Sequence, residues 1–116
     1  MMIGEDLLVD ESLIQPARSL TEMRTIVVRL LQDLRAGATP SWLRTEHLKL
    51  TRAARKTWNA IEMGTLRVGS KAVMREIWKV TCPDIGRSLH SQTINHERIA
   101  RDVSLLLETI DHVLVP

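Results

Sequence analysis

The stretch SLTEMRTIVVRLLQDL, residues 19–34, decides the fold that we expect for this chain. Apolar side chains recur in it at steps of three and four residues, which is the period of one face of a helix. The positions are Leu20, Met23, Val27, Leu30 and Leu34, with Ile26, Val28 and Leu31 widening the stripe on its flanks. The stretch therefore predicts an amphipathic helix whose apolar stripe is broad enough to meet more than one neighbour.

Both ends of this helix carry sequence signals. Ser19 and Glu22 have the spacing of a capping box, so we expect the helix to begin at Ser19. Gly37 is expected to end it, because glycine adopts the left-handed conformation that closes many helices. Residues 1–18 carry four acidic side chains against one basic side chain. We interpret them as an extended acidic arm, since Pro16 is expected to stop a helix from running through.

Three further helices are expected after Gly37. The second follows Thr39-Pro40 and closes at Gly64, with Leu43, Leu50, Ala54, Trp58 and Ile61 at helical spacing. The third begins after Ser70, presents Val73, Met74, Ile77 and Trp78 on one face, and ends at Cys82-Pro83. The last spans residues 93–113 with Ile99, Val103, Leu106, Ile110 and Val113 as its seam, flanked by Leu107 and Leu114. The sequence thus predicts an all-α protein, a small bundle of about four helices over residues 19–116 with the arm at residues 1–18.

Composition excludes several classes of function. The 116 residues contain three Trp but no Phe or Tyr, so the chain lacks most of the aromatic platforms on which bases stack. A single cysteine rules out an internal disulfide and suits a reducing compartment. Residues 1–8 lack the basic start of a secretory signal, and no apolar run is long enough to span a membrane. We therefore expect a soluble cytoplasmic protein.

The reactive side chains do not form a catalytic or metal-binding pattern. His90 and His96 are six residues apart, which does not place them on one helix face as a spacing of four would. Cys82 stands beside Pro83 at an expected helix end, where it is accessible but not activated. The sequence contains no glycine-rich phosphate loop and no nucleophile elbow. We expect no enzymatic activity, no metal and no cofactor.

The middle of the chain is basic. Residues 42–79 carry nine Lys or Arg against Glu46, Glu62 and Glu76. In the second helix Lys49, Arg52 and Lys56 fall on one face with Arg55 beside them, which is the pattern that phosphate binding requires. The same pattern is also typical of a solvated helix face or of a surface for an acidic protein. Nucleic-acid contact through this face is the alternative function.

Apolar stripes on the first and last helices exceed what a bundle of this size needs to bury. Such a surplus, together with tryptophans on three different stretches, favours a protein-interaction module and a homodimer. We place the protein-binding site at Ile26, Val27, Leu30 and Leu31. In this interpretation Leu20, Met23, Val27 and Leu34 face the bundle, whereas Ile26 and Leu30 lie towards the rim.

In its length, its acidic N-terminal arm and its Leu- and Val-rich helix Leu20 to Leu34, the chain resembles the quorum-sensing antiactivators of the QslA kind. The resemblance implies a dimeric protein that binds the ligand-binding domain of a LuxR/LasR-type transcription factor. It implies further that the protein covers the dimerisation surface of that factor and so blocks DNA binding. No diagnostic motif anchors the comparison, so it assigns no residues.

Two alternatives from other classes stay open. The basic face of the second helix suits a direct DNA-binding regulator of the phage or plasmid type. Small dimeric secretion chaperones are a further class of similar size, although they are usually acidic. A salt titration of binding to random duplex DNA separates a DNA-binding regulator from a protein-binding one.

Overall fold

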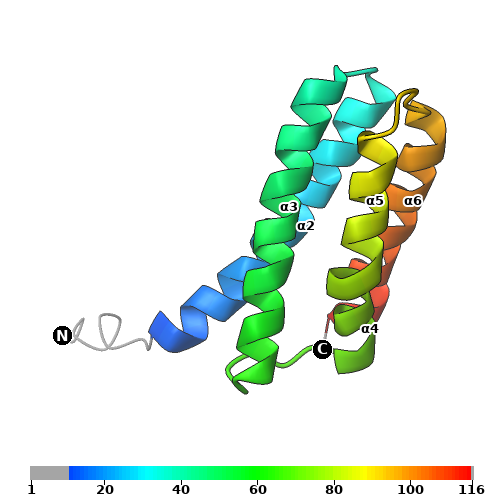
Figure 1. The fold of residues 1–116 in the computed structure, drawn as a ribbon. Coiled ribbons are helices and arrows are strands. Elements are labelled where there is room, and N and C mark those ends of the chain that lie inside the picture. The colour runs from blue at the N-terminus through cyan, green and yellow to red at the C-terminus, as the bar shows by residue number, and fades with distance from the viewer. Residues whose placement is uncertain (1–10, 116) are drawn as a thin grey trace.

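The computed structural model describes residues 11–115, with side chains from residue 18 onward. This part of the chain contains only helices, arranged as an antiparallel bundle of four helical rods (Figure 1). The rods are α2 (Glu11–Arg35); α3 (Pro40–Glu62); α4 (Lys71–Glu76), η1 (Ile77–Thr81) and α5 (Cys82–Leu89) in succession; and α6 (His96–Thr109) with η2 (Ile110–Leu114). The predicted all-α bundle is confirmed. No helix within residues 11–115 has the length and apolar character that a membrane span requires.

The first helix begins eight residues earlier than expected. It runs through Pro16 to Arg35, and its first turns project beyond the bundle (Figure 1). Ser19 lies buried within the helix. Because a Ser-x-x-Glu spacing also occurs within helices, it does not by itself mark a start, and the expected beginning at Ser19 is wrong. The extended N-terminal arm is thus helical from Glu11 onward, and residues 1–10 of the arm lie outside the described residues.

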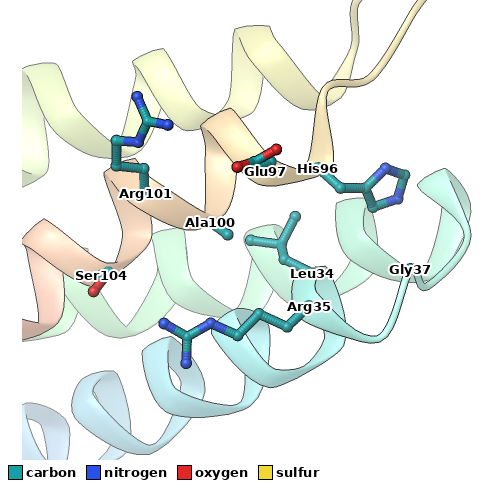
Figure 2. Close-up of a pocket in the computed structure, with 8 residues that line it drawn as sticks. All are labelled: Leu34, Arg35, Gly37, His96, Glu97, Ala100, Arg101 and Ser104. Carbon is teal, nitrogen blue, oxygen red and sulfur yellow. The ribbon is translucent and has the colours of Figure 1, made fainter.

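The glycines end the first two helices as expected. Gly37 has a φ of 73° and Gly64 has a φ of 76°, both in the left-handed region. After α2 the amide of Ala38 donates to the carbonyl of Asp33 and that of Gly37 to Leu34, which is the Schellman pattern. Figure 2 shows the resulting turn opposite the first residues of α6, where His96 Nε2 lies 3.0 Å from the Ala38 carbonyl oxygen. This contact fixes the start of α6 against the end of α2.

The third helix passes through Cys82-Pro83, so the expected stop there is wrong. Ser70 caps its start as expected, its hydroxyl accepting from the Val73 amide at 3.2 Å. Residues 77–81 form a π turn in which the Cys82 amide donates to the Ile77 carbonyl five residues back. A wider turn relieves the clash of a proline ring with the preceding carbonyl and needs no amide from Pro83 itself. The helix therefore continues as α5.

A second π turn changes which residue of the last helix is buried. The helix begins after Asn95, whose side chain accepts from the Arg98 amide at 3.0 Å, and not at Thr93 as expected. Ile99, Val103, Leu106 and Ile110 are buried, as their spacing predicts. The turn at residues 110–114 then inserts one residue, so Leu114 takes the inward position and Val113 remains exposed.

Candidate protein-binding surface

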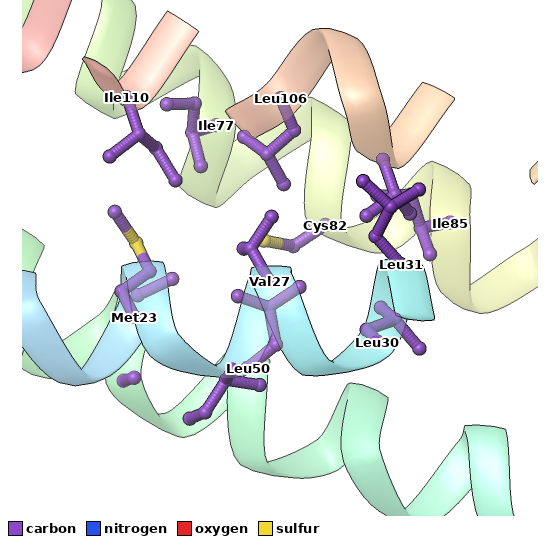
Figure 3. Close-up of a cluster of buried hydrophobic side chains, with 14 of the residues drawn as sticks. Met23, Val27, Leu30, Leu31, Leu50, Ile77, Cys82, Ile85, Leu106 and Ile110 are labelled. Carbon is purple, nitrogen blue, oxygen red and sulfur yellow. The ribbon is translucent and has the colours of Figure 1, made fainter. Parts of the chain in front are cut away.

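The four residues that the sequence places in a protein-binding site belong to the core. Ile26, Val27, Leu30 and Leu31 are all buried, and Leu30 is 0% exposed. Helix α2 packs against α3 on one side and α6 on another, so both flanks of its broad stripe are covered. Figure 3 shows Val27 and Leu31 pointing towards side chains of the helices opposite. The expectation that Ile26 and Leu30 lie at an accessible rim is therefore wrong.

The basic residues of α3 are exposed, and the fold adds others to them. Lys49, Arg52, Arg55 and Lys56 all lie on the solvent side of α3. The α4–η1 rod runs beside α3 and presents Lys71, Arg75 and Lys79 at successive turns. These three cations line a cavity of about 590 Å³ with Trp58 and Glu62 of α3. We call this the basic groove. The sequence shows the cations but not that two helices share them.

The three tryptophans have different environments. Trp42 is half exposed and donates from its indole Nε1 to Asp33 at 2.8 Å. Trp58 is buried, and the ammonium group of Lys71 lies 5.9 Å from the centre of its ring. Trp78 is partly buried against the core. Only Trp42 of the three is exposed, so the tryptophans do not mark one common binding site.

His47 and Cys82 serve as structural residues. His47 Nε2 lies 2.7 Å from the carbonyl oxygen of Cys82 and ties α3 to α5. Cys82 is fully buried, not accessible as expected, and burial raises the pKa of its thiol to about 12. The thiol therefore stays protonated at neutral pH. Among residues 18–115, no three His, Cys, Asp or Glu side chains are grouped closely enough to hold a metal ion.

A cavity of about 670 Å³ separates the end of α2 from the start of α6 (Figure 2). Its lining mixes charges of both signs, with Arg35 and Arg101 against Glu97. His96 Nε2 lies 3.0 Å from the Ala38 carbonyl oxygen. The charges described in the lining thus do not favour a ligand of one sign.

A second groove, between α4–η1–α5 and α6–η2, has a different lining. It encloses about 530 Å³ and has an apolar floor formed by Ile77, Ile85 and Leu106, which are buried. Its upper walls include Leu105, which is 57% exposed, and Val113, which is 38% exposed. Large apolar side chains at the edge of a groove lose contact with water only when another surface covers them. We call this the acidic groove, for the carboxylates described next.

Three carboxylates and no Lys or Arg line the acidic groove. They are Glu76, Asp84 and Asp102, one from each of α4, α5 and α6. Asp84 forms an ion pair with Arg87 of its own helix. Neither Glu76 nor Asp102 forms an ion pair with any residue in the part of the chain that has described side chains. The groove thus joins exposed apolar side chains to uncompensated negative charge.

The exposure of Leu105 is foreshadowed in the sequence by three consecutive leucines, although a spacing of three and four residues does not reveal it. Residues 105–107 are three consecutive leucines on one helix. Consecutive residues of a helix point about 100° apart, so three neighbours cannot all face the same core. Leu106 is buried, Leu107 is half-buried and Leu105 is left outside. By contrast, the exposure of Val113 depends on the π turn and is not predictable from the spacing.

Glu46 is a buried carboxylate at the contact between α3 and α2. It is 2% exposed, and its Oε2 atom has no hydrogen-bond partner among the residues whose side chains are described. Burial, and then the neighbouring carboxyl of Asp33, raise the pKa of Glu46 to about 6, while Arg29 and Lys49 act in the opposite direction. At neutral pH the side chain is therefore a poorly solvated negative charge inside the bundle.

We predict that Glu46→Gln stabilises the protein at pH 7 by about 1–2 kcal/mol, because the folded state no longer holds this charge. In the wild type the unfolded chain loses the Glu46 proton near pH 4.5 and the folded chain near pH 6. The stability that the folded state gains by binding this proton more tightly is fully present below pH 4.5 and is lost as the pH rises through about 6. Urea denaturation from pH 4 to 7.5 measures the effect.

In the same titration, Glu108→Gln at an exposed position of α6 serves as the control and should leave the pH dependence unchanged. If Glu46→Gln lowers the stability at pH 7, the glutamate is engaged in a favourable interaction as an anion, and the prediction fails.

Comparison of the chain with protein-family models, with curated proteins and with solved structures finds no match. Function must therefore be inferred from the surface itself, because a fold of this kind supports many activities.

Proposed function

We propose that this chain is a small non-enzymatic regulatory protein that acts by binding another protein through the acidic groove. The observation that supports the proposal most strongly is the exposure of Leu105 and Val113 beside an apolar floor. The floor residues Ile77, Ile85 and Leu106 already belong to the bundle core, whereas Leu105 and Val113 lie outside it. A partner that inserts apolar side chains would remove both groups from water.

The proposal changes where a partner binds. The apolar stripe of residues 19–34 predicts a contact on α2, but a partner reaching Ile26 or Leu30 would have to open the core. The acidic groove is available without any rearrangement, and most complexes form with little movement of the backbone. The interface is therefore assigned to the α4–α6 side of the bundle.

For the partner, we propose a transcription factor of the LuxR/LasR type, bound so that its dimerisation surface is covered. Support for this identity comes from the resemblance to quorum-sensing antiactivators in length, acidic N-terminus and residues 20–34. The surface through which a transcription factor dimerises is apolar at its centre. A groove with exposed apolar side chains can therefore compete with the second subunit for that surface. The homodimer implied by the same resemblance is part of the proposal.

To test the proposal, binding of the chain to the ligand-binding domain of a LasR-type receptor is measured by calorimetry. A gel shift then measures binding of the whole receptor to its operator in the presence of the chain. We expect binding and loss of the shifted DNA band. The double variant Leu105→Gln/Val113→Gln should weaken binding roughly 100-fold, because each side chain is worth about 1.5 kcal/mol when buried. Leu48→Gln is the matched control, since Leu48 is 50% exposed on α3.

The outcomes separate the parts of the proposal. Equal weakening by Leu48→Gln would move the interface to α3. Unchanged affinity of the double variant would remove the acidic groove from the interface, and absence of any receptor binding would contradict the antiactivator function.

A second candidate function, direct DNA binding, is favoured by the basic groove. Its cations Lys71, Arg75 and Lys79 lie beside the exposed Arg52 and Arg55 of α3. Contacts with phosphates release counterions, so such binding falls steeply as salt increases. Affinity for random duplex DNA that decreases tenfold or more between 50 and 200 mM salt, and that Arg75→Glu abolishes, would favour this second function.

A further inference from the structure

We propose that the ligand of the acidic groove is a cationic amphipathic helix, whose apolar side chains enter between α4–η1–α5 and α6–η2 while its Lys and Arg side chains meet Glu76 and Asp102. This inference rests on the proposed protein-binding function and specifies the chemistry of the partner.

The shape of the groove fits a helix. Two roughly antiparallel rods, α4–η1–α5 and α6–η2, form its walls, and it is lined along both from Val73 to Ile85 and from Asp102 to Val113 (Figure 1). A partner helix recognised in a groove of this kind presents apolar side chains at positions i, i+3, i+4 and i+7. Leu105 and Val113 are exposed and would make the main contacts with those side chains, above a buried floor of Ile77, Ile85 and Leu106.

The negative charge of the groove favours a partner of positive charge. All of its charged lining residues are carboxylates, although the whole chain has a formal charge of +2. Glu76 lies on one wall and Asp102 on the other, so the negative charge flanks the apolar floor on both sides. An anionic helix would bring like charges together at a partly desolvated interface, whereas a cationic helix would compensate Glu76 and Asp102.

A second copy of this chain is a poorer occupant. The basic groove of a second copy would bring Lys71, Arg75 and Lys79, on α4 and η1, to the acidic groove. Beside them in the basic groove the large apolar side chain is Trp58, which is buried and cannot enter another molecule. That surface therefore supplies charge without an apolar anchor, and a separate amphipathic helix supplies both.

Three synthetic 18-residue peptides test the inference with the full chain. The first has leucines at helical i, i+3, i+4, i+7 spacing with lysines between them, the second has glutamates in place of the lysines, and the third scrambles the first. By fluorescence polarisation we expect the cationic helix to bind at least tenfold more tightly than the other two. Glu76→Gln/Asp102→Asn should reduce this preference about tenfold, and Leu105→Gln should weaken binding of the cationic helix.

The control replaces the same number of charges outside the groove. Glu62→Gln/Glu97→Gln removes two exposed carboxylates that line other cavities and should leave the affinity for the cationic helix unchanged. All variants change side chains at exposed positions of helices, and circular dichroism verifies that each remains folded.

Several results would overturn the inference. Equal affinity for the glutamate peptide, equal affinity for the scrambled peptide, or equal loss in the control variant would show that the groove does not select a cationic helix. A homodimer that Leu105→Gln dissociates would place a second copy in the groove instead. If the receptor binds in a Leu105-dependent manner but the cationic peptide does not, the proposed function stands and this inference fails. If the cationic peptide binds and the receptor does not, this inference stands and the receptor is not the partner.

Discussion

Leu30→Ala is expected to lower the free energy of unfolding by about 2–5 kcal/mol, a large share of the 5–15 kcal/mol that a domain of this size typically has. Leu30 is 0% exposed and belongs to the central apolar cluster between α2 and its neighbours. Truncation removes its buried methyl groups and leaves a cavity that rigid helices fill only in part. Urea denaturation followed by far-ultraviolet circular dichroism measures the loss.

The matched control for this prediction is Leu48→Ala, which removes the same atoms from a position that is 50% exposed on α3. It should change the stability by no more than about 0.5 kcal/mol. Leu30→Arg should leave the chain unfolded, because the larger side chain does not fit the packed core and burying its charge costs several kcal/mol. A folded Leu30→Arg protein that fails only to bind a partner would restore α2 as a contact surface and contradict the structure.

Gly69→Ala is expected to lower the free energy of unfolding by about 3 kcal/mol or more, at the upper end of the range for overpacking. A methyl group at this position would lie 2.1 Å from the carbonyl oxygen of Val113, which is backbone and cannot rotate away. The Gly69 amide also donates to the Leu114 carbonyl at 2.9 Å, so the displacement would break the bond that fixes η2. Leu114, which is fully buried, would move with it.

Hydrogen exchange distinguishes this mechanism from a general loss of stability. In Gly69→Ala, amides of residues 110–114 should lose protection before those of α2 and α3 do. Gly37→Ala is the control: it strains a residue with φ of 73°, but its methyl group meets nothing within 4 Å. It should therefore lower the overall stability and leave the order of exchange unchanged. Uniform loss of protection in Gly69→Ala would show that the Val113 contact is not the cause.

Local chemistry accounts for the features that were predicted correctly. Thr39-Pro40, Ser70, Gly37 and Gly64 mark helix ends in the sequence and in the structure, because caps act through groups two to five residues away. The inward positions of α3 follow in the same way from their spacing. Predictions failed where a local signal had a tertiary alternative. Pro83 is accommodated by a π turn, and that turn forms within a rod that packs against α3.

The sequence by itself determined the class of fold, the boundaries between α2, α3 and α4, and the chemistry of the exposed cations, since each depends on residues close together in the chain. Only the tertiary structure decided which apolar side chains remain accessible. Ile26 and Leu30 are buried because α2 has neighbours on two sides, and Leu105 and Val113 are exposed because no helix within residues 11–115 covers the outer side of α6 and η2. The spacing of residues along a helix predicts which of them share a face. How many other helices pack around that helix depends instead on contacts between residues distant in sequence. The acidic groove, with carboxylates from three separate helices, exists only through those contacts.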